Sequence, residues 1–275
     1  MMASRPGQVR KTAVTAGTGS LSAWWRGPAL LLLCALSLQL YFVLRIGLMA
    51  VLAPQSTSFQ RSEIWRLAVE KHQVAWSQTW VDEAQIAGTL KRAVIASEDA
   101  GFVDHKGVEW DALEKAWDKN QHAEAVAGRR QAQLDKRAKP AAGSRPRPVV
   151  EAKLVGGSTI SQQLAKNLFL SGERTALRKS QEFVLTLALE GLLGKRRILE
   201  IYLNNVEWGE GVFGAQAAAR HYFRTDAARL DWAAAARLAV MLPAPKRFEK
   251  SPGSAYVNGR AATISARMAS VALPD

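Results

Sequence analysis

The sequence predicts a mainly α-helical protein with one long apolar helix near its N-terminus. Three observations support this fold class. After about residue 79, apolar residues recur at three- and four-residue spacing, which is the period of an amphipathic helix. No segment shows the convincing alternation of a half-buried strand. A long uncharged run precedes all of these helical segments.

This apolar run predicts a transmembrane anchor over residues 29–53. Residues 29–44 carry no charge, and the chain stays apolar beyond Arg45. As a helix the run is about 37 Å long, which exceeds a hydrocarbon core of about 30 Å. Residues 1–28 are basic and lack acidic groups, so they are expected to form a cytoplasmic tail. A cleaved signal peptide is the alternative, although the run is longer than a usual signal core.

The charge of the chain favours an anionic partner. A formal net charge of +13 suits nucleic acid, an acidic membrane surface or a phosphate-bearing substrate. Export of the part after the anchor argues against nucleic acid. The single cysteine, Cys34, excludes an intramolecular disulfide.

The exported part is expected to contain a juxtamembrane connector over residues 54–78 and a domain over residues 79–275. Helices are expected at residues 82–97, 110–117, 158–170, 177–193, 196–203, 215–223, 231–242 and 254–271. Residues 118–153 hold many Lys, Arg, Ala and Gln and few large apolar residues. We therefore expect a solvated polar insertion there, partly disordered.

One of these helices has a predicted apolar face, and another has a predicted inward face. In the helix over residues 177–193 the apolar face consists of Phe183, Val184, Leu187 and Leu192. In the helix over residues 196–203 the inward face consists of Ile198, Leu199, Tyr202 and Leu203.

Two adjacent carboxylates, Glu98 and Asp99, follow the helix predicted over residues 82–97. Like-charge repulsion and the helix macrodipole both disfavour them there. A carboxylate acting as general base or acid would explain their presence, and so would a solvated acidic turn. Phe102 and His105 follow in the same segment. No second histidine lies at helical spacing from His105, so no zinc site is expected.

A polar face is predicted at the start of the helix over residues 158–170. Ser158, Gln162 and Lys166 recur every four residues and should share this face. A hydroxyl, an amide and a cation at a glycine-rich helix start could hold sugar hydroxyls and a phosphate. Helix capping is the simpler role for Ser158 and Thr159, because Thr159 and Gln162 have the spacing of a capping box.

Basic residues gather around the start of the next helix. Arg178 and Lys179 precede Glu182 by four and three residues, which ordinary surface ion pairs would explain. The alternative is a diphosphate site that Glu182 orients and that Lys166 and Arg174 extend. With a carboxylate nearby, such a cluster suits the departure of a sugar from an anionic group. The carboxylate would take a proton from the incoming hydroxyl, and the cations would meet the charge on the leaving phosphate.

Four segments resemble the sequence blocks of the peptidoglycan glycosyltransferases, glycosyltransferase family 51. In order along the chain they are EDAGFVDHKGVEW, GGSTISQQLAKNLFL, RKSQEFVLTLALE and KRRILEIYLNNVEWGEGVFGAQAAARHYF. No transpeptidase segment follows, so the chain resembles the monofunctional members. Two features depart from the family: the insertion is longer than expected, and the last block, LAVMLPAPKRFEKSP, is a looser match to which no catalytic role is assigned.

The resemblance implies a lysozyme-like fold and the polymerisation of lipid II into β-1,4 glycan strands, with release of the polyprenyl diphosphate. The carboxylate that matches Glu98 deprotonates the 4-hydroxyl of the acceptor, and Glu182 matches the family's second glutamate. The matching substrate-binding residues are Lys166, Arg174 and Lys179 at the diphosphate, and Ser158, Gln162 and Gln163 along the cleft. Asp99, Phe102, His105 and Arg178 complete the predicted substrate-binding set.

The resemblance also implies the setting of the enzyme. We expect a single-pass protein of the bacterial inner membrane with a periplasmic catalytic domain. No tightly bound cofactor and no protein metal site are expected, although magnesium or another divalent cation assists the diphosphate in some members. Expected partners are lipid II, the growing strand, the membrane, and cell-division proteins or other peptidoglycan synthases.

Two other functions fit part of this pattern. A lysozyme-like muramidase or lytic transglycosylase would use Glu98 as a general acid. A non-catalytic scaffold anchored in the membrane would bind cell-wall components without turnover. The basic cluster argues against the muramidase, because glycan cleavage releases no diphosphate.

Overall fold

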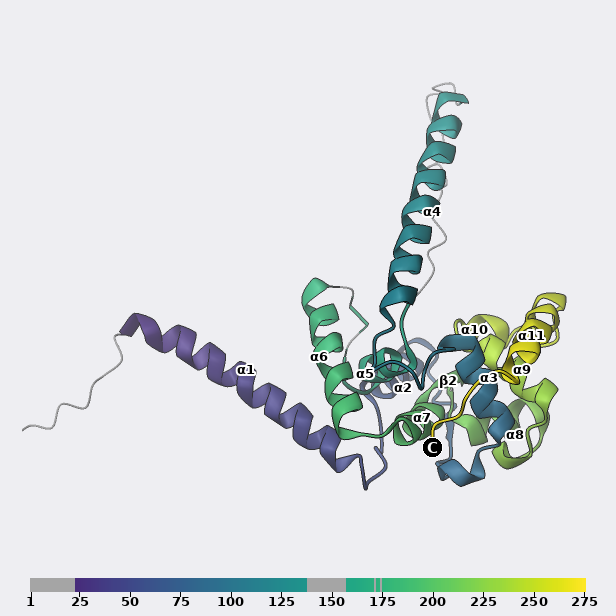
Figure 1. Cartoon of the computed structure of the whole chain (residues 1–275), viewed down its shortest axis with the longest axis horizontal. Helices are drawn as coiled ribbons and strands as arrows, with labels where there is room; N and C mark the ends of the chain where they lie inside the picture. The colour runs from purple at the N-terminus through teal and green to yellow at the C-terminus, as the bar shows by residue number, and fades with distance from the viewer. Residues whose placement is uncertain (1–22, 138–156, 171, 174) are drawn as a thin grey trace, which may run out of the picture. The chain divides into compact units, whose positions relative to one another are not determined.

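The computed structural model describes residues 23–137, 157–170, 172–173 and 175–275, and the chain forms two units (Figure 1). The first unit ends at Leu44 and the second comprises Arg45–Asp275.

Helix α1 spans Ala23–Leu48 and contains the apolar run. Its stretch from Trp25 to Leu48 is long and apolar enough to cross a membrane. Leucine side chains along it are exposed, including Leu31 at 74% and Leu44 at 64%. Such exposure fits a helix surrounded by lipid. The predicted anchor is therefore a helix, and it begins before residue 29 and ends before residue 53.

The second unit is mainly helical, as predicted. Its α-helices are α2 (Ser58–Glu70), α3 (Gly88–Glu98), α4 (Trp110–Arg137), α5 (Ile160–Phe169), α6 (Ala176–Leu192), α7 (Lys195–Asn205), α8 (Ala215–Phe223), α9 (Trp232–Met241), α10 (Pro245–Phe248) and α11 (Ala255–Met268). Two short 3₁₀ helices span Glu83–Gln85 and Ala227–Arg229. Helix α3 packs on α9 and α11, while α5 packs on α2, α6 and α7. The inward face predicted for α7 is confirmed, because all four of its residues are buried.

A small sheet, which the sequence did not indicate, lies beside these helices. Its strands are β1 (Ser77–Gln78), β2 (Glu207–Gly209) and β3 (Val212–Phe213), in the order β1-β3-β2. Strand β3 pairs parallel with β1 and antiparallel with β2. Strands of two or three residues are too short to show an alternating pattern, which explains why they were missed.

The segment predicted as a connector belongs to the folded unit instead. Helix α2 begins at a complete capping box formed by Thr57 and Gln60, and both of these residues are buried. Leu67 on α2 is buried as well, and the Trp76 ring stacks on Phe213 of β3 with centroids 4.4 Å apart. The polar composition misled the prediction because several of these polar groups cap and pair inside the domain.

The predicted insertion is partly helical. Helix α4 continues through residues 118–137, where a solvated and partly disordered segment was expected. Ala, Lys, Arg and Gln are strong helix formers, so this composition supports a helix that has little to bury. Most described side chains of this part of α4 are exposed, which agrees with the expected solvation. Residues 138–153 of the insertion lie outside the described residues.

The apolar face predicted for α6 is not its buried face. Phe183, Val184, Leu187 and Leu192 are each at least 37% exposed. The buried face instead consists of Glu182, Leu185, Thr186 and Leu189. Apolar residues surround most of this helix, so their spacing alone could not select the buried side.

Candidate active site

Glu98 and Asp99 lie at the C-terminal end of α3, as the last helical residue and the C-cap. The Asp99 side chain is fully buried. Its Oδ2 accepts a hydrogen bond from the backbone N–H of Ile160 at 2.9 Å, at the start of α5. The positive end of the α5 dipole therefore stabilises the Asp99 carboxylate, which the end of α3 disfavours.

His105 holds the other oxygen of Asp99. Its Nδ1 accepts from the backbone N–H of Gly107 at 3.0 Å, which leaves the proton on Nε2. Nε2 then donates to Asp99 Oδ1 at 2.7 Å. The His105 side chain thus bridges the two ends of the turn from Asp99 to Gly107.

A metal ion would have to compete with these hydrogen bonds. Ligand atoms of Asp99, His105 and Glu109 lie within 4.8 Å of one another. Both oxygens of Asp99 and both ring nitrogens of His105 are already engaged. The hydrogen bonds of this cluster therefore fit a role in stabilising the turn better than a role in binding a resident metal ion.

Phe102 and Gly107 complete this turn as packing residues. Phe102 is fully buried, with Lys195 Nζ 4.5 Å from its ring centroid. Gly107 has a φ of +88°, and a Cβ there would lie 2.7 Å from Thr186 Cγ2 on α6. The structure thus shows structural contacts for Asp99, Phe102 and His105, and their predicted contact with substrate stays a prediction.

Glu98 points into a different environment from its neighbour. Its Oε2 accepts from Gln163 Nε2 at 3.1 Å, and its Oε1 accepts from Ser97 Oγ at 3.3 Å. Burial raises the pKa of the Glu98 carboxyl above its ordinary value, while the hydrogen bonds from Gln163 and Ser97 oppose that rise. A carboxylate with a raised pKa is a stronger base, so Glu98 is suited to accept a proton from a substrate hydroxyl.

A pocket of about 340 Å³ opens beside Glu98. Its lining residues are Ser97, Glu98, Val240, Pro243, Phe248, Tyr256 and Arg260. The Phe248 and Tyr256 rings stack with centroids 5.8 Å apart and planes 6° from parallel. Arg260, on α11, is exposed, and its positive charge favours the ionised form of Glu98.

Sequence reasoning missed Phe248, Tyr256 and Arg260. They lie in or after the loosely matching last block, and only the fold brings them to Glu98. The four-residue spacing of Tyr256 and Arg260 on one helix was the available signal.

Helix α5 carries the polar residues predicted at its start, but they do not form one shared face. Thr159 caps the helix and forms a complete capping box with Gln162, as predicted. Gln162 is buried and turned back onto the cap, so the structure assigns it capping. Ser158 is exposed and precedes the cap, and Lys166 is exposed one turn before the helix end. Contact of these residues with substrate stays a prediction.

Helix α6 carries the basic cluster together with its buried glutamate. Glu182 Oε2 accepts from Arg178 Nη1 at 2.9 Å, and Oε1 pairs with Lys179 Nζ. The Glu182 side chain is 4% exposed, whereas that of Lys179 is 51% exposed. Both Glu182 oxygens are thus paired with cations, and the predicted catalytic role of Glu182 stays a prediction. Arg174 lies outside the described residues.

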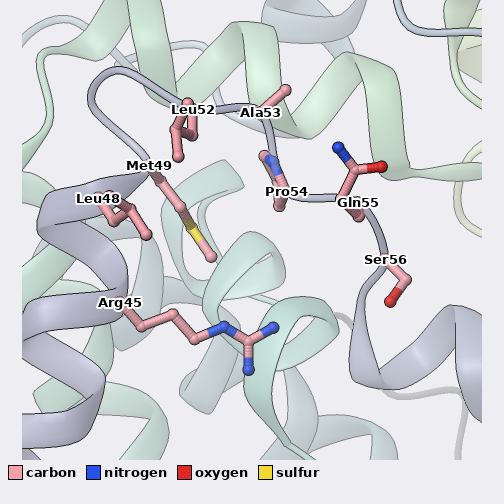
Figure 2. Close-up of a pocket in the computed structure, with 8 residues that line it drawn as sticks. All are labelled: Arg45, Leu48, Met49, Leu52, Ala53, Pro54, Gln55 and Ser56. Carbon is pink, nitrogen blue, oxygen red and sulfur yellow. The ribbon is translucent and has the colours of Figure 1, made fainter.

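A second pocket, of about 380 Å³, lies where α1 ends, away from the predicted site residues. Its lining residues are Arg45, Leu48, Met49, Leu52, Ala53, Pro54, Gln55 and Ser56. Figure 2 shows the Arg45 side chain extending from the helix below Met49, while residues 53–56 line the opposite wall. The Arg45 guanidinium lies over the Phe169 ring, 5.4 Å from its centroid. This pocket combines an apolar wall with one cation and holds no carboxylate.

Comparison with known proteins gives a family match over most of the chain. The model of the transglycosylase family matches residues 67–129 and 147–269. The break between the two matched parts falls inside the segment predicted as an insertion.

Three relatives illustrate the similarity, and each is named biosynthetic peptidoglycan transglycosylase. The protein of Paraburkholderia phytofirmans is 44% identical over 99% of this chain and 97% of its own length. That of Herminiimonas arsenicoxydans is 47% identical over 88% of this chain and 94% of its own length. That of Bordetella pertussis is 48% identical over 80% of this chain and 82% of its own length.

Proposed function

This chain belongs to the transglycosylase family, and we propose that it is a peptidoglycan glycosyltransferase that polymerises lipid II into β-1,4 glycan strands. One observation carries the proposal: the buried carboxylate of Glu98, with a raised pKa, forms the wall of a pocket large enough for a sugar. The names of the relatives support the same chemistry.

The reaction begins with a proton transfer to Glu98. The acceptor sugar lies in the pocket against the Phe248–Tyr256 wall, with its 4-hydroxyl toward the carboxylate. As Glu98 takes the proton, the hydroxyl oxygen attacks the anomeric carbon of the lipid-linked donor and inverts it. The bond between that carbon and the diphosphate breaks, and its electron pair stays on the leaving diphosphate oxygen.

Cations on α5 and α6 meet the charge that develops on the leaving group. Arg178 and Lys179 are held in place by Glu182, and Lys166 is exposed on the adjacent helix α5. Fixed cations stabilise a developing anion because they need no reorganisation during the reaction. Helix α6 also exposes Leu177 at 81%, so it offers both charge and apolar surface to a lipid-linked diphosphate.

The same proposal assigns the location and the accessory groups. Helix α1 crosses the bacterial inner membrane once, with the basic tail cytoplasmic and the second unit periplasmic; the helix length and the basic residues before it support this. No cofactor is bound tightly. A divalent cation such as magnesium would assist the substrate diphosphate. We do not propose the Asp99 cluster as its site, because both Asp99 oxygens already accept hydrogen bonds. Cell-division proteins or other peptidoglycan synthases are the proposed protein partners, and nucleic acid is excluded by export.

Two substrates offered in parallel test the proposal. Purified full-length protein in lipid vesicles is given labelled lipid II, and separately purified cell-wall sacculi. We expect lipid II to be converted into glycan strands with stoichiometric release of polyprenyl diphosphate, and the sacculi to stay intact. Soluble fragments from sacculi without lipid II consumption would establish a muramidase instead. Binding of lipid II without turnover would establish a scaffold.

A further inference from the structure

Two hydrogen bonds in series connect the Glu98 carboxylate to a tyrosine on another helix. Gln163 on α5 lies between them: its Nε2 donates to Glu98 Oε2 at 3.1 Å, and its Oε1 accepts from the Tyr202 hydroxyl at 3.0 Å. Tyr202 is on α7 and is only 1% exposed. The resemblance places Gln163 along the cleft but gives Tyr202 no role.

We propose that Tyr202 is a positioning residue for the transfer reaction, which holds the Gln163 amide with its nitrogen rather than its oxygen against the Glu98 carboxylate. This inference rests on the proposed function, in which Glu98 is the base. Tyr202 touches no reacting atom and acts only through Gln163.

The amide of Gln163 needs such a constraint because its last torsion is soft. Rotation by half a turn exchanges the amide oxygen and nitrogen at little intrinsic cost. In the rotated state an oxygen would face the Glu98 carboxylate, which repels it when ionised and donates to it when protonated. The Tyr202 hydroxyl opposes the rotation by donating to Oε1. The second N–H of Nε2 points to the Ser158 carbonyl, 3.4 Å away, which favours the same orientation.

Tyr202 can act as this donor throughout the pH range below the ordinary pKa of tyrosine. Burial, followed by the charges of Glu98 and Asp99, raises the pKa of Tyr202 well above its ordinary value of 10.0. The hydroxyl therefore keeps its proton, and within the described part of the chain it donates to Gln163 Oε1. This hydrogen bond therefore opposes the rotation of Gln163 whether Glu98 is ionised or protonated.

This arrangement affects the titration of Glu98. The charged groups that act on Glu98 are Asp99 beside it and Arg260 on α11, and the neutral donors are Gln163 and Ser97. Asp99 raises the pKa of Glu98, whereas Arg260, Gln163 and Ser97 lower it. If the Gln163 N–H is lost or rotated away, the pKa of Glu98 rises further. Because activity needs ionised Glu98, activity should then be lost earlier as the pH is lowered, at a higher pH than in the wild type.

The pH profile of kcat tests the proposal with full-length Tyr202→Phe in lipid vesicles supplied with lipid II. We expect the acidic limb to move to higher pH, with about a fivefold loss of kcat at the acid end, as for one lost hydrogen bond. The loss should nearly vanish on the alkaline plateau, and the KM for lipid II should stay unchanged. Tyr222→Phe is the matched control, because that hydroxyl donates to Trp208 O at 2.9 Å outside the pocket.

Two further variants separate positioning from a general structural role. Gln163→Met removes the donor to Glu98 from a partly exposed site, so it should shift the same limb even if Tyr202→Phe fails to fold. The double variant should shift the limb no further than Gln163→Met alone, because Tyr202 acts only through Gln163. A uniform loss of kcat at all pH values, additive shifts in the double variant, or no shift in Gln163→Met would overturn the proposal.

Failure of this inference can be distinguished from failure of the proposed function. An inactive Glu98→Gln enzyme with an unshifted Tyr202→Phe profile would overturn the positioning role alone. An active Glu98→Gln enzyme would overturn the assignment of the base and the positioning role together.

Discussion

Glu98 and Asp99 are neighbours in the sequence, but the fold places their side chains in different environments. The Asp99 side chain is fully buried, and its two oxygens accept hydrogen bonds from His105 and from the backbone at the start of α5. Glu98 faces a pocket and keeps a raised pKa. Two carboxylates whose environments differ this much can serve as a structural anchor and a base side by side.

Gly107 is the residue that lets the turn after Asp99 approach α6. Gly107→Ala should lower the free energy of unfolding by more than the ~1–2 kcal/mol of a left-handed alanine, because its Cβ would also meet Thr186 at 2.7 Å. Urea unfolding followed by circular dichroism measures the change. Gly128→Ala is the control, since Gly128 lies in α4 with open space around its Cβ. The control should be neutral or gain up to ~1 kcal/mol, and an equal loss in both variants would refute the steric argument.

Glu207 should make the stability of the protein depend on pH. Burial raises its pKa from the ordinary value of 4.5 to about 7, and Lys246 opposes this only partly from 3.5 Å. Between these two pKa values the unfolded chain has released the proton while the folded chain still holds it. Stability is therefore lost as the pH rises through this window.

The prediction for Glu207 is a thermal midpoint that falls from pH 5 to pH 8 in the wild type. Glu207→Gln should reduce that fall, because a glutamine has no proton to release. The exposed Glu70→Gln serves as the control and should leave the fall unchanged. Equal falls in wild type and Glu207→Gln, measured by differential scanning calorimetry, would show that Glu207 is not responsible.

At the scale of elements, the cap of α5 joins two parts of the site, the start of this helix and the turn at Gly107. The Thr159 hydroxyl oxygen accepts a hydrogen bond from the backbone N–H of Gln162, and the backbone N–H of Thr159 donates to the side-chain oxygen of Gln162. The Thr159 hydroxyl also donates to the backbone oxygen of Gly107 at 2.6 Å. Thr159→Ala should cost about 1 kcal/mol of stability for the cap and more for the lost contact with the turn.

Thr159→Ser keeps the hydroxyl and is the matched control for this cap. It should recover most of the stability lost in Thr159→Ala, as measured by urea unfolding. If serine and alanine were equally destabilising, the methyl group would be the important part of Thr159, and the capping argument would be wrong.

Local sequence predicted elements well where one face alone was apolar or where a cap was present. Helix α7 buries the predicted face, and Thr159 and Gln162 form the predicted box. The same reasoning did not predict the buried face of α6, where Glu182 is buried and Phe183 is exposed. Its burial depends on pairing with Arg178 and Lys179, and apolar spacing cannot report a pairing of that kind.

The candidate site was predictable only in the blocks that carry the family resemblance. Glu98 and Gln163 do meet in the structure, which confirms that these two blocks come together. The pocket wall of Phe248, Tyr256 and Arg260 could not be predicted. Long-range packing of α11 on α3 places Tyr256 and Arg260 beside Glu98, and the Phe248 ring at the end of α10 stacks on Tyr256. Contacts between distant segments leave no local signature in a single sequence.

At the scale of the whole molecule, the chain joins an apolar helix to a folded catalytic unit. The leucine side chains of helix α1 are exposed. The unit from Arg45 onward contains the pocket beside Glu98 and the cationic residues Arg178 and Lys179. The proposed lipid-linked substrate requires an enzyme held at the membrane, so under the proposed function the apolar helix and the active site would serve one reaction. The net charge of +13 agrees with a substrate that carries a diphosphate.

The central claim is that Glu98 is the base, and the rate of lipid II polymerisation by Glu98→Gln tests it most directly. Glutamine keeps the shape of the side chain and cannot accept a proton, so the rate should fall by at least about 10²-fold, as for the loss of a general base. Glu70→Gln makes the same chemical change on the exposed side of α2 and should polymerise at the wild-type rate. Wild-type polymerisation by a folded Glu98→Gln enzyme would contradict the account.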